Sequence, residues 1–377
     1  MVVKRWRVRR NYQSLGVLND IAKMIRIGRV YYLLLIFIPI SYYFAFFTSD
    51  KTLTFITSIL AVIPLARIMG YCTKEIVIQT NPTISGLISA TFGNFIELII
   101  AIIALQNGLI SLVQASMIGS IIGNLLLLVG LSLLFGGLRY KHQTFNNTTI
   151  AVSSTMLIIV VAGLAIPSVY LFTTPSGYEN IGVLSTAVAI VMAVIYIAGL
   201  VFSLKTHRDL FDASDEIRDT QENPTMTIKL STLILLITVI IVALEAQLLV
   251  TAIEEAAITI GITQTFIGII IIATITNIAE NATAIHFALK NKLDVSIEIG
   301  LSSAIQIALF VVPILMVISQ IFNYGFTLEF SLFQLVSLVL AVMIVNYLSA
   351  DGRCNWLEGA QLISVYLIII IAFFFIQ

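Results

Sequence analysis

The chain has 377 residues, of which 59% are hydrophobic and 11% are charged, and its formal net charge is zero. Soluble domains carry about a quarter charged residues, so this composition excludes an ordinary soluble globular protein and indicates lipid as the main solvent. The two cysteines, Cys72 and Cys354, are too few for a disulfide scaffold or a cysteine metal cluster.

Long apolar runs dominate the chain, and a membrane-spanning helix needs about 20 mostly apolar residues. The first run follows a basic segment but lacks a small-residue cleavage site, so we interpret it as a membrane helix and not as a signal sequence. The runs lie at 31–47, 53–78, 83–105, 111–136, 147–172, 180–204, 227–258, 262–289, 293–322, 326–349 and 356–376. The sequence therefore predicts an all-α integral membrane protein with about eleven transmembrane helices.

The distribution of basic residues predicts the orientation of the chain. If the N-terminus is cytoplasmic, eleven alternating spans place all 20 Lys and Arg residues on the cytoplasmic side except Lys51, which lies outside, and Arg67, which lies within a span. Cytoplasmic loops of membrane proteins carry an excess of Lys and Arg. We therefore expect a cytoplasmic N-terminus and an external C-terminus.

An internal repeat relates the two halves of the chain at a constant offset of 183 residues. The segment Ala90–Glu97 (ATFGNFIE) aligns with Ala273–Glu280 (ATITNIAE), and the same offset places Ser120 on Ser303. The two copies begin five spans apart, and because five is odd they run in opposite directions through the bilayer. Inverted repeats are typical of secondary transporters, which bind substrate near the membrane midplane where the halves meet.

The repeat divides the chain into four parts. Residues 1–50 form the N-terminus and a first helix outside the repeat, 51–204 the first five-helix repeat, 205–226 an acidic cytoplasmic linker, and 227–377 the second five-helix repeat. We expect a short helix in the linker, whose acids either concentrate or sense cations or form a solvated connection.

Glu97 and Glu280 are the strongest candidates for a functional role. Each lies inside an apolar span, where a charged group costs at least about 2.5–3.5 kcal/mol and is usually functional. Asn94 and Asn277 precede them by three residues, which places each amide on the same helical face as its glutamate. Oxygen ligands of this kind suit hard cations, Ca²⁺ above all. Because carboxylates also bind protons, metal ion and protons compete for one site, which is the physical basis of antiport.

Other polar residues form a second group of candidates. Ser120, Ser303 and Gln306 either supply further oxygens or bond across a helix interface. Glu75, Glu254 and Glu255 lie near span ends, where they either gate or recruit cations or remain solvated. The chain contains no P-loop, no Ser-His-Asp grouping and no His-Glu-x-x-His motif, so we expect no enzyme activity and no cofactor.

Several segments resemble the calcium/proton branch of the calcium/cation antiporter superfamily. The similarity covers roughly residues 60–377 and rests on Gly93–Ile99, Gln114–Ser116, Gly119–Ser120, Asn124–Leu126, Glu254–Ala256, Asn277–Glu280, Ser302–Ser303, Ile305–Ala308, Asp351–Arg353 and Asn355–Ala360. The resemblance implies eleven helices and proton-driven export of cytoplasmic Ca²⁺. It also implies that both glutamates bind the ion in alternation with protons, assisted by Asn94, Asn277, Ser120, Ser303 and Gln306.

The sequence departs from the family pattern around the second glutamate. Thr276 stands where the family has glycine, Asn281 where it has histidine, and Ala304 where it has a second serine, with Ser302 at a glycine position. Cation choice therefore stays open: Mn²⁺ or Na⁺ exchange is the runner-up, followed by a passive cation channel and by a membrane scaffold. The expected partners are Ca²⁺, protons and the lipid bilayer of a prokaryotic cell membrane, with no nucleic acid and with homo-oligomerisation left open.

Overall fold

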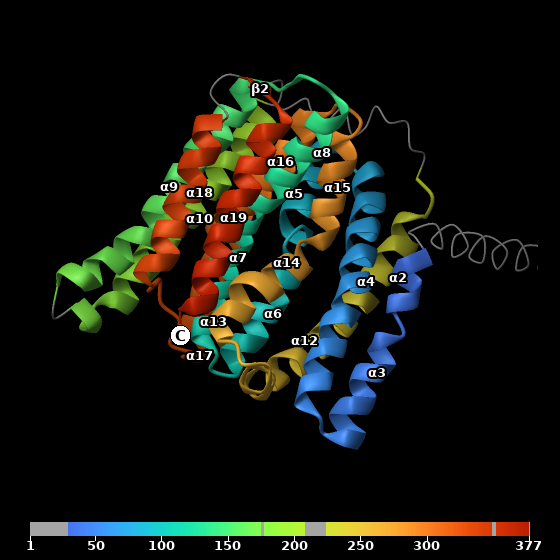
Figure 1. The fold of residues 1–377 in the computed structure, drawn as a ribbon, viewed down its shortest axis with the longest axis vertical. Helices are drawn as coiled ribbons and strands as arrows, with labels where there is room; N and C mark the ends of the chain where they lie inside the picture. The colour runs from blue at the N-terminus through green and yellow to red at the C-terminus, as the bar shows by residue number, and fades with distance from the viewer. Residues whose placement is uncertain (1–28, 175–176, 208–223, 349–351, 377) are drawn as a thin grey trace, which may run out of the picture.

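The computed structural model describes residues 29–174, 177–207, 224–348 and 352–376. Helices make up nearly all of this part of the chain and run roughly parallel or antiparallel to one another (Figure 1). The predicted acidic helix falls on residues 208–223, which lie outside the described residues.

The helices and strands have the following bounds. In the first half they are α2 (Arg29–Leu34), α3 (Phe37–Tyr43), η2 (Phe44–Thr48), α4 (Lys51–Ile78), α5 (Pro82–Phe92), α6 (Phe95–Gln106), α7 (Ile110–Ile122), η3 (Gly123–Leu128), α8 (Val129–Arg139), β1 (Gln143–Thr144), α9 (Asn147–Thr173), η4 (Gly177–Glu179), α10 (Ile181–Val201) and η5 (Phe202–Thr206). In the second half they are α12 (Ile228–Ile260), α13 (Gln264–Phe266), η7 (Ile267–Ile272), α14 (Ala273–Thr276), α15 (Ile278–Ala288), α16 (Leu293–Gln306), η8 (Ile307–Val311), α17 (Val312–Phe322), α18 (Leu332–Leu348), β2 (Arg353–Cys354) and α19 (Trp356–Phe375).

Within the described residues, eight helices are long and apolar enough to cross a bilayer, and two bent helix pairs raise the number to as many as ten. The remaining predicted span, 326–349, is helical only over the 17 residues of α18. The integral-membrane, all-helical prediction is confirmed, and the count of eleven stays a prediction.

Two of the predicted spans are broken helices and not continuous ones. The first bends by 42° between α5 and α6, and the second by 54° between α14 and α15. Both breaks fall at an asparagine, Asn94 and Asn277, whose backbone leaves the helical conformation. Asparagine competes with the helical backbone for hydrogen bonds and is favoured at helix ends. The break frees backbone groups that the surrounding protein must satisfy, which membranes tolerate only away from lipid.

The break positions follow the sequence repeat. Helices α6 and α15 begin 183 residues apart, and so do α7 and α16. Each of the latter continues into a π-helical turn, η3 after α7 and η8 after α16. The internal similarity in sequence therefore corresponds to the same succession of helical elements.

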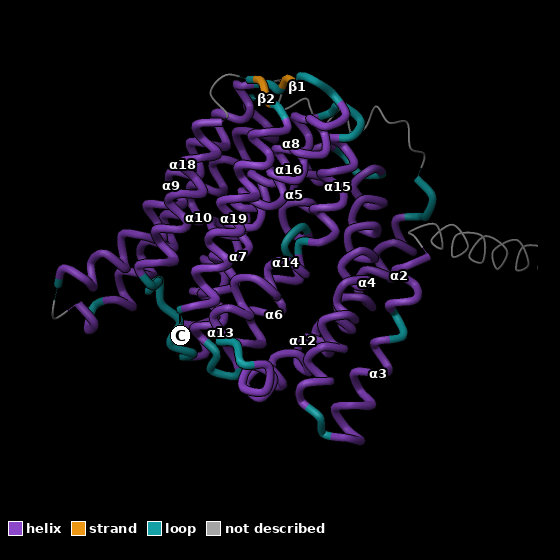
Figure 2. Tube along the Cα trace, in the orientation of Figure 1, coloured by secondary structure: helices purple, strands orange, loops and turns teal. Residues whose placement is uncertain are grey.

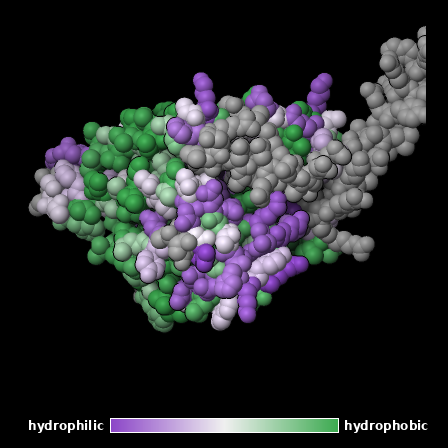
Figure 3. All heavy atoms as spheres, turned by 90° about the horizontal axis from the view of Figure 1, so that it is seen from above, coloured by the Kyte–Doolittle hydropathy of each residue, from purple (hydrophilic) through white to green (hydrophobic). Residues whose placement is uncertain are grey.

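The short connections at one end of the bundle are tied together by a two-stranded sheet, and we call this the strand end (Figure 2). Strands β1 and β2 are antiparallel, with Gln143 opposite Cys354. The Gln143 amide also donates to the Ala288 carbonyl at 3.1 Å, which joins the end of α15 to the sheet. Figure 3 shows hydrophilic residues gathered over the middle of this end and hydrophobic residues on the flank, as expected of a protein with polar ends and lipid-facing sides.

The first helix is fixed to the bundle through a buried carboxylate. Helices α4 and α12, of 28 and 33 residues, pack side by side, and α3 packs along α4 (Figure 1). Glu245 of α12 is fully buried and accepts hydrogen bonds from the Ser41 hydroxyl of α3 at 3.0 Å to each carboxylate oxygen. A carboxylate in an apolar interior needs such donors, so Glu245 connects α3 to α12.

Candidate functional site

The first helix break meets α16 through three polar side chains. The Asn94 amide donates to Gln306 Oε1 at 2.8 Å, and the Ser303 hydroxyl donates to Asn94 Oδ1 at 2.9 Å. Asn94 and Ser303 are 1% and 3% exposed. Because polar groups buried at this depth need partners, the network fixes the break against α16.

The second helix break meets η3 at an asparagine that the sequence analysis did not assign to the site. Asn124 is fully buried, and its amide donates to Ser303 Oγ at 2.8 Å and to Asn277 Oδ1 at 3.5 Å. The Asn277 amide donates to the Ala273 carbonyl at 2.9 Å, which is one of the groups near the break. Asn124 thus connects the two halves through Ser303.

Glu97 and Glu280 each lie in the first turn of the helix that follows a break, α6 and α15. A helix N-terminus carries a partial positive charge, which favours a carboxylate there. Glu97 is 5% exposed and interacts with the Thr276 hydroxyl of the other half. Glu280 is half-buried, interacts with Ser303 and lies within the field of Glu97. Its Oε2 atom is buried and has no hydrogen-bond partner.

The predicted ligands are therefore brought together with one exception in the contacts they make. Asn94, Ser303 and Gln306 are hydrogen-bonded directly, and the two glutamates and Asn277 adjoin them. Ser120 is 1% exposed on α7, one helical turn before Asn124, and so lies on the same helical face. The combined set of carboxylate, amide and hydroxyl oxygens has the chemistry that hard cations prefer.

The departures from the family pattern surround this network. The Thr276 hydroxyl bonds the Ile272 carbonyl at 3.1 Å in addition to interacting with Glu97. Asn281 has a buried Oδ1 atom without a hydrogen-bond partner, next to Glu280 in sequence. Ala304 is fully buried. Thr276 and Asn281 thus place two extra polar groups beside the glutamates.

The residues proposed from sequence as gates lie outside this network. Glu75, at the strand end of α4, is 3% exposed and accepts hydrogen bonds from Thr225 N, Thr225 Oγ1 and Met226 N at 2.8–3.1 Å. It holds the segment that leads into α12. Glu254 and Glu255 are exposed near the other end of α12, where Glu254 accepts from Gln264. A role of Glu75 or Glu255 in gating or in recruiting cations stays a prediction.

The network is packed differently on its two sides. On one side η7 lies directly against α7: a Cβ atom added at Gly119 would overlap the Ile269 backbone, and one at Gly268 would come within 2.9 Å of the Leu112 carbonyl. On the other side, at α5, Ser89 and Gly93 are exposed. A Cβ atom at Gly93 would lie 3.1 Å from Gln306 Oε1, so Gly93 leaves the amide of Gln306 room beside the opening. The site is closed toward η7 and reachable along α5.

Residues 51–205 and 230–375 match the family described as sodium/calcium exchanger protein. The chain is 41% identical over 367 residues to a Ca²⁺/H⁺ antiporter of Aphanothece halophytica, covering 93% of this chain and 98% of the relative. It is 39% identical over 339 residues to the Ca²⁺/H⁺ antiporter ChaA of Bacillus subtilis, covering 89% and 96%. These relatives confirm the resemblance seen in the sequence.

Solved structures show the same fold. The structure of native YfkE superposes with a TM-score of 0.80 at 36% identity, covering 92% of this chain and 99% of that chain. A crystal structure of the H⁺/Ca²⁺ exchanger CAX superposes with a TM-score of 0.66 at 17% identity, covering 94% and 92%, and supports the fold alone. By sequence and by fold, the chain belongs to the sodium/calcium exchanger protein family.

Proposed function

We propose that this protein is a secondary active transporter that exchanges cytoplasmic Ca²⁺ for protons by alternating access. The observation that carries the proposal is the pair of glutamates, one from each half, that begins α6 and α15 beside a shared network of amide and hydroxyl oxygens. The names of the relatives at 39–41% identity support the choice of ions.

Proton coupling follows from the chemistry of the pair. Two carboxylates that act on each other electrostatically share a site that is neutralised either by one divalent cation or by protons. Glu97 and Glu280 would hold Ca²⁺ together with Asn94, Asn277, Ser120, Ser303 and Gln306. Release of Ca²⁺ without protonation would leave two buried carboxylates close together, so return of the empty site requires protons.

The proposed architecture consists of a first helix followed by two inverted five-helix repeats, 51–204 and 227–377, with residues 205–226 as a cytoplasmic linker. Lys141, Lys290, Lys292 and Arg353 lie at or beside the connections of the strand end, whereas Lys51 begins α4 at the other end. The positive-inside rule then makes the strand end cytoplasmic, with the N-terminus inside and the C-terminus outside. The opening along α5 faces the cytoplasm in this assignment, which makes the structure inward-facing.

Ca²⁺ binding should weaken as the pH falls, because protons neutralise the same carboxylates that hold the cation. For each proton displaced, the apparent dissociation constant should rise about tenfold per pH unit in the range where the site titrates. Ca²⁺ titrations of the purified protein between pH 5 and pH 8, as about the accessible range for such carboxylates, measure this slope. An affinity that does not change with pH would contradict competition at one site.

Substitution of Asn124 by leucine should weaken apparent Ca²⁺ affinity by about tenfold or more, since groups that orient metal ligands typically contribute 10–100-fold. The change removes the donor to Ser303 and Asn277 while keeping an apolar side chain of similar size. Ca²⁺ titration measures the effect, with Asn107→Ala as control because the Asn107 amide donates to the Ile103 carbonyl of its own helix. Unchanged affinity in Asn124→Leu would remove Asn124 from the site.

The proposal is tested by Ca²⁺ flux into proteoliposomes under an imposed pH gradient in both directions. Coupled exchange predicts that Ca²⁺ moves against the proton flow and that reversing the pH gradient reverses it. Flux that ignores the gradient would indicate a channel. Because Thr276 and Asn281 add polar groups beside the glutamates, Mn²⁺ and Na⁺ are measured in the same vesicles, and proton-coupled movement of one of them in place of Ca²⁺ would establish the second candidate, a related exchanger.

A further inference from the structure

A tyrosine on the last helix of the second half bonds the gating segment of that half. Tyr366 of α19 is 4% exposed, and its hydroxyl lies 3.3 Å from the Thr274 hydroxyl of α14. Thr274 lies three residues before the break at Asn277. The rings of Phe266 and Phe374 meet edge to face with centroids 5.6 Å apart, so the same two segments also pack together near the opposite end. The segment α13–η7–α14 is therefore held on both α7 and α19.

The first half contains an equivalent pair of residues. Thr91 occupies the position 183 residues before Thr274 and lies three residues before the break at Asn94. Tyr196 lies on α10, which packs on α17 and η8 as α19 packs on α8 and η3. Thr91 and Tyr196 thus stand in the first half where Thr274 and Tyr366 stand in the second.

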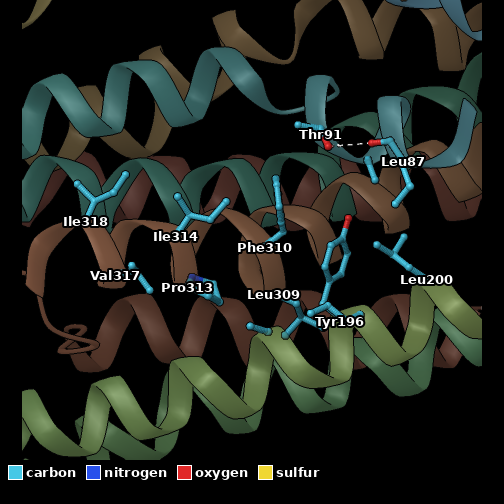
Figure 4. Close-up of a pocket in the computed structure, with 13 residues that line it drawn as sticks. Leu87, Thr91, Tyr196, Leu200, Leu309, Phe310, Pro313, Ile314, Val317 and Ile318 are labelled. Atoms are coloured by element: carbon cyan, nitrogen blue, oxygen red, sulfur yellow. Dashed lines mark hydrogen bonds between the residues drawn. The ribbon is translucent and has the colours of Figure 1, made fainter. Parts of the chain in front are cut away.

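In this structure the equivalent bond of the first half is not made. The Thr91 hydroxyl donates to the Leu87 carbonyl of its own helix at 2.8 Å. Tyr196 is 7% exposed, and its hydroxyl is buried without a hydrogen-bond partner. Figure 4 shows the Tyr196 hydroxyl pointing from α10 toward α5, where Thr91 lies. A buried hydroxyl without a partner is costly, so this group is poised for an acceptor or donor that approaches it.

A cavity of about 390 Å³ separates the two residues from closer packing. Its lining includes Leu87 and Thr91 of α5, Tyr196 and Leu200 of α10, and Phe310 and Ile314 of the η8–α17 helix (Figure 4). Movement of α5 toward α10 would fill this space and bring the Thr91 hydroxyl toward Tyr196. The second half shows the arrangement after such packing, in which Thr274 already meets Tyr366.

We propose that Thr91–Tyr196 and Thr274–Tyr366 are two positioning pairs that form in alternation and select which side of the ion site is open. This inference rests on the proposed alternating-access function. The Thr274–Tyr366 bond stabilises the present state, in which α5 leaves the site open, and the Thr91–Tyr196 bond stabilises the state in which α5 has closed. A hydrogen bond present in only one of two states shifts their populations toward that state.

Cysteine labelling measures this balance without transport. Ser89 is exposed and its repeat equivalent, Ile272, is 4% exposed, so a cysteine at 89 reports the present state and one at 272 reports the other. Each probe, Ser89→Cys or Ile272→Cys, is placed in a chain whose Cys72 and Cys354 are replaced by alanine. Its reaction rate with a small water-soluble thiol reagent is then followed in Ca²⁺-free proteoliposomes.

The pairs predict opposite shifts from two equally conservative substitutions. Tyr366→Phe should raise the labelling rate at position 272 about threefold and lower it at 89, whereas Tyr196→Phe should lower the rate at 272 about threefold. Tyr347→Phe, on the exposed face of α18, is the control and should change neither rate. Shifts of the same sign in both variants, or no shift, would overturn the pairs. Because no Ca²⁺ is present, failure of Ca²⁺/H⁺ exchange would not by itself alter these rates.

Discussion

Glu97→Gln and Glu280→Gln each abolish Ca²⁺/proton exchange, with a loss of at least about 100-fold in the initial rate of flux. Glutamine keeps the size and one oxygen of the side chain but cannot be charged, so the site loses half of the negative charge that a divalent cation needs. The substitution also removes one of the two groups that carry protons. Measured in proteoliposomes under a pH gradient, the loss should be equal for the two variants, because one ion needs both halves.

The matched control is Glu245→Gln, another buried intramembrane glutamate, which bonds Ser41 of the first helix. It lies outside the network of Asn94, Ser303 and Gln306, so exchange should continue at a measurable rate. Monodisperse elution of all three variants in detergent shows that they are folded. Exchange at the wild-type rate in either Glu97→Gln or Glu280→Gln would exclude that residue from the site.

Gly119→Ala should lower the thermal stability of the protein and slow exchange. The added methyl group meets the Ile269 backbone, which cannot rotate away as a side chain can, so α7 and η7 must separate. Overpacking of a close contact typically costs about 1–3 kcal/mol. Because this contact closes the site on its η7 side, the variant should also leak toward that side, which is measured as Ca²⁺ flux without a pH gradient.

Gly123→Ala is the matched control, since it lies four residues further along the same span and a Cβ atom there would meet no atom within 4 Å. Its melting temperature and its exchange rate should equal those of the wild type. Equal melting temperatures for Gly119→Ala and wild type would show that the two helices tolerate separation, and would remove this contact from the closed side of the site.

Sequence reasoning identified the chemistry of the site because the signals were specific. A glutamate inside an apolar span is costly, and two at one offset, each with asparagine three residues earlier, identified α6 and α15. The repeat also predicted that Ser303 and Gln306 of the following span face the same point, and the Asn94 contacts confirm that these side chains meet. The lipid-spanning character of the helices followed directly from composition.

Other features could not be predicted from the same patterns. The runs 83–105 and 262–289 are apolar throughout, so hydropathy alone did not show the breaks at Asn94 and Asn277, although asparagine beside glycine or threonine was a signal. Asn124 was missed as a site residue because its repeat equivalent is Ile307 and the search relied on matched positions. Which side is open depends on the packing of α5 and η7, a property of one conformation and not of the sequence pattern.

The most direct test of the central claim is proton movement driven by Ca²⁺ alone. Proteoliposomes with equal pH inside and outside are given a Ca²⁺ gradient, and the internal pH is recorded with the membrane potential clamped. The account predicts that Ca²⁺ entering the vesicles drives protons out and raises the internal pH, and that Glu97→Gln and Glu280→Gln abolish this change. Ca²⁺ uptake with no change in internal pH would contradict exchange through a shared pair of carboxylates.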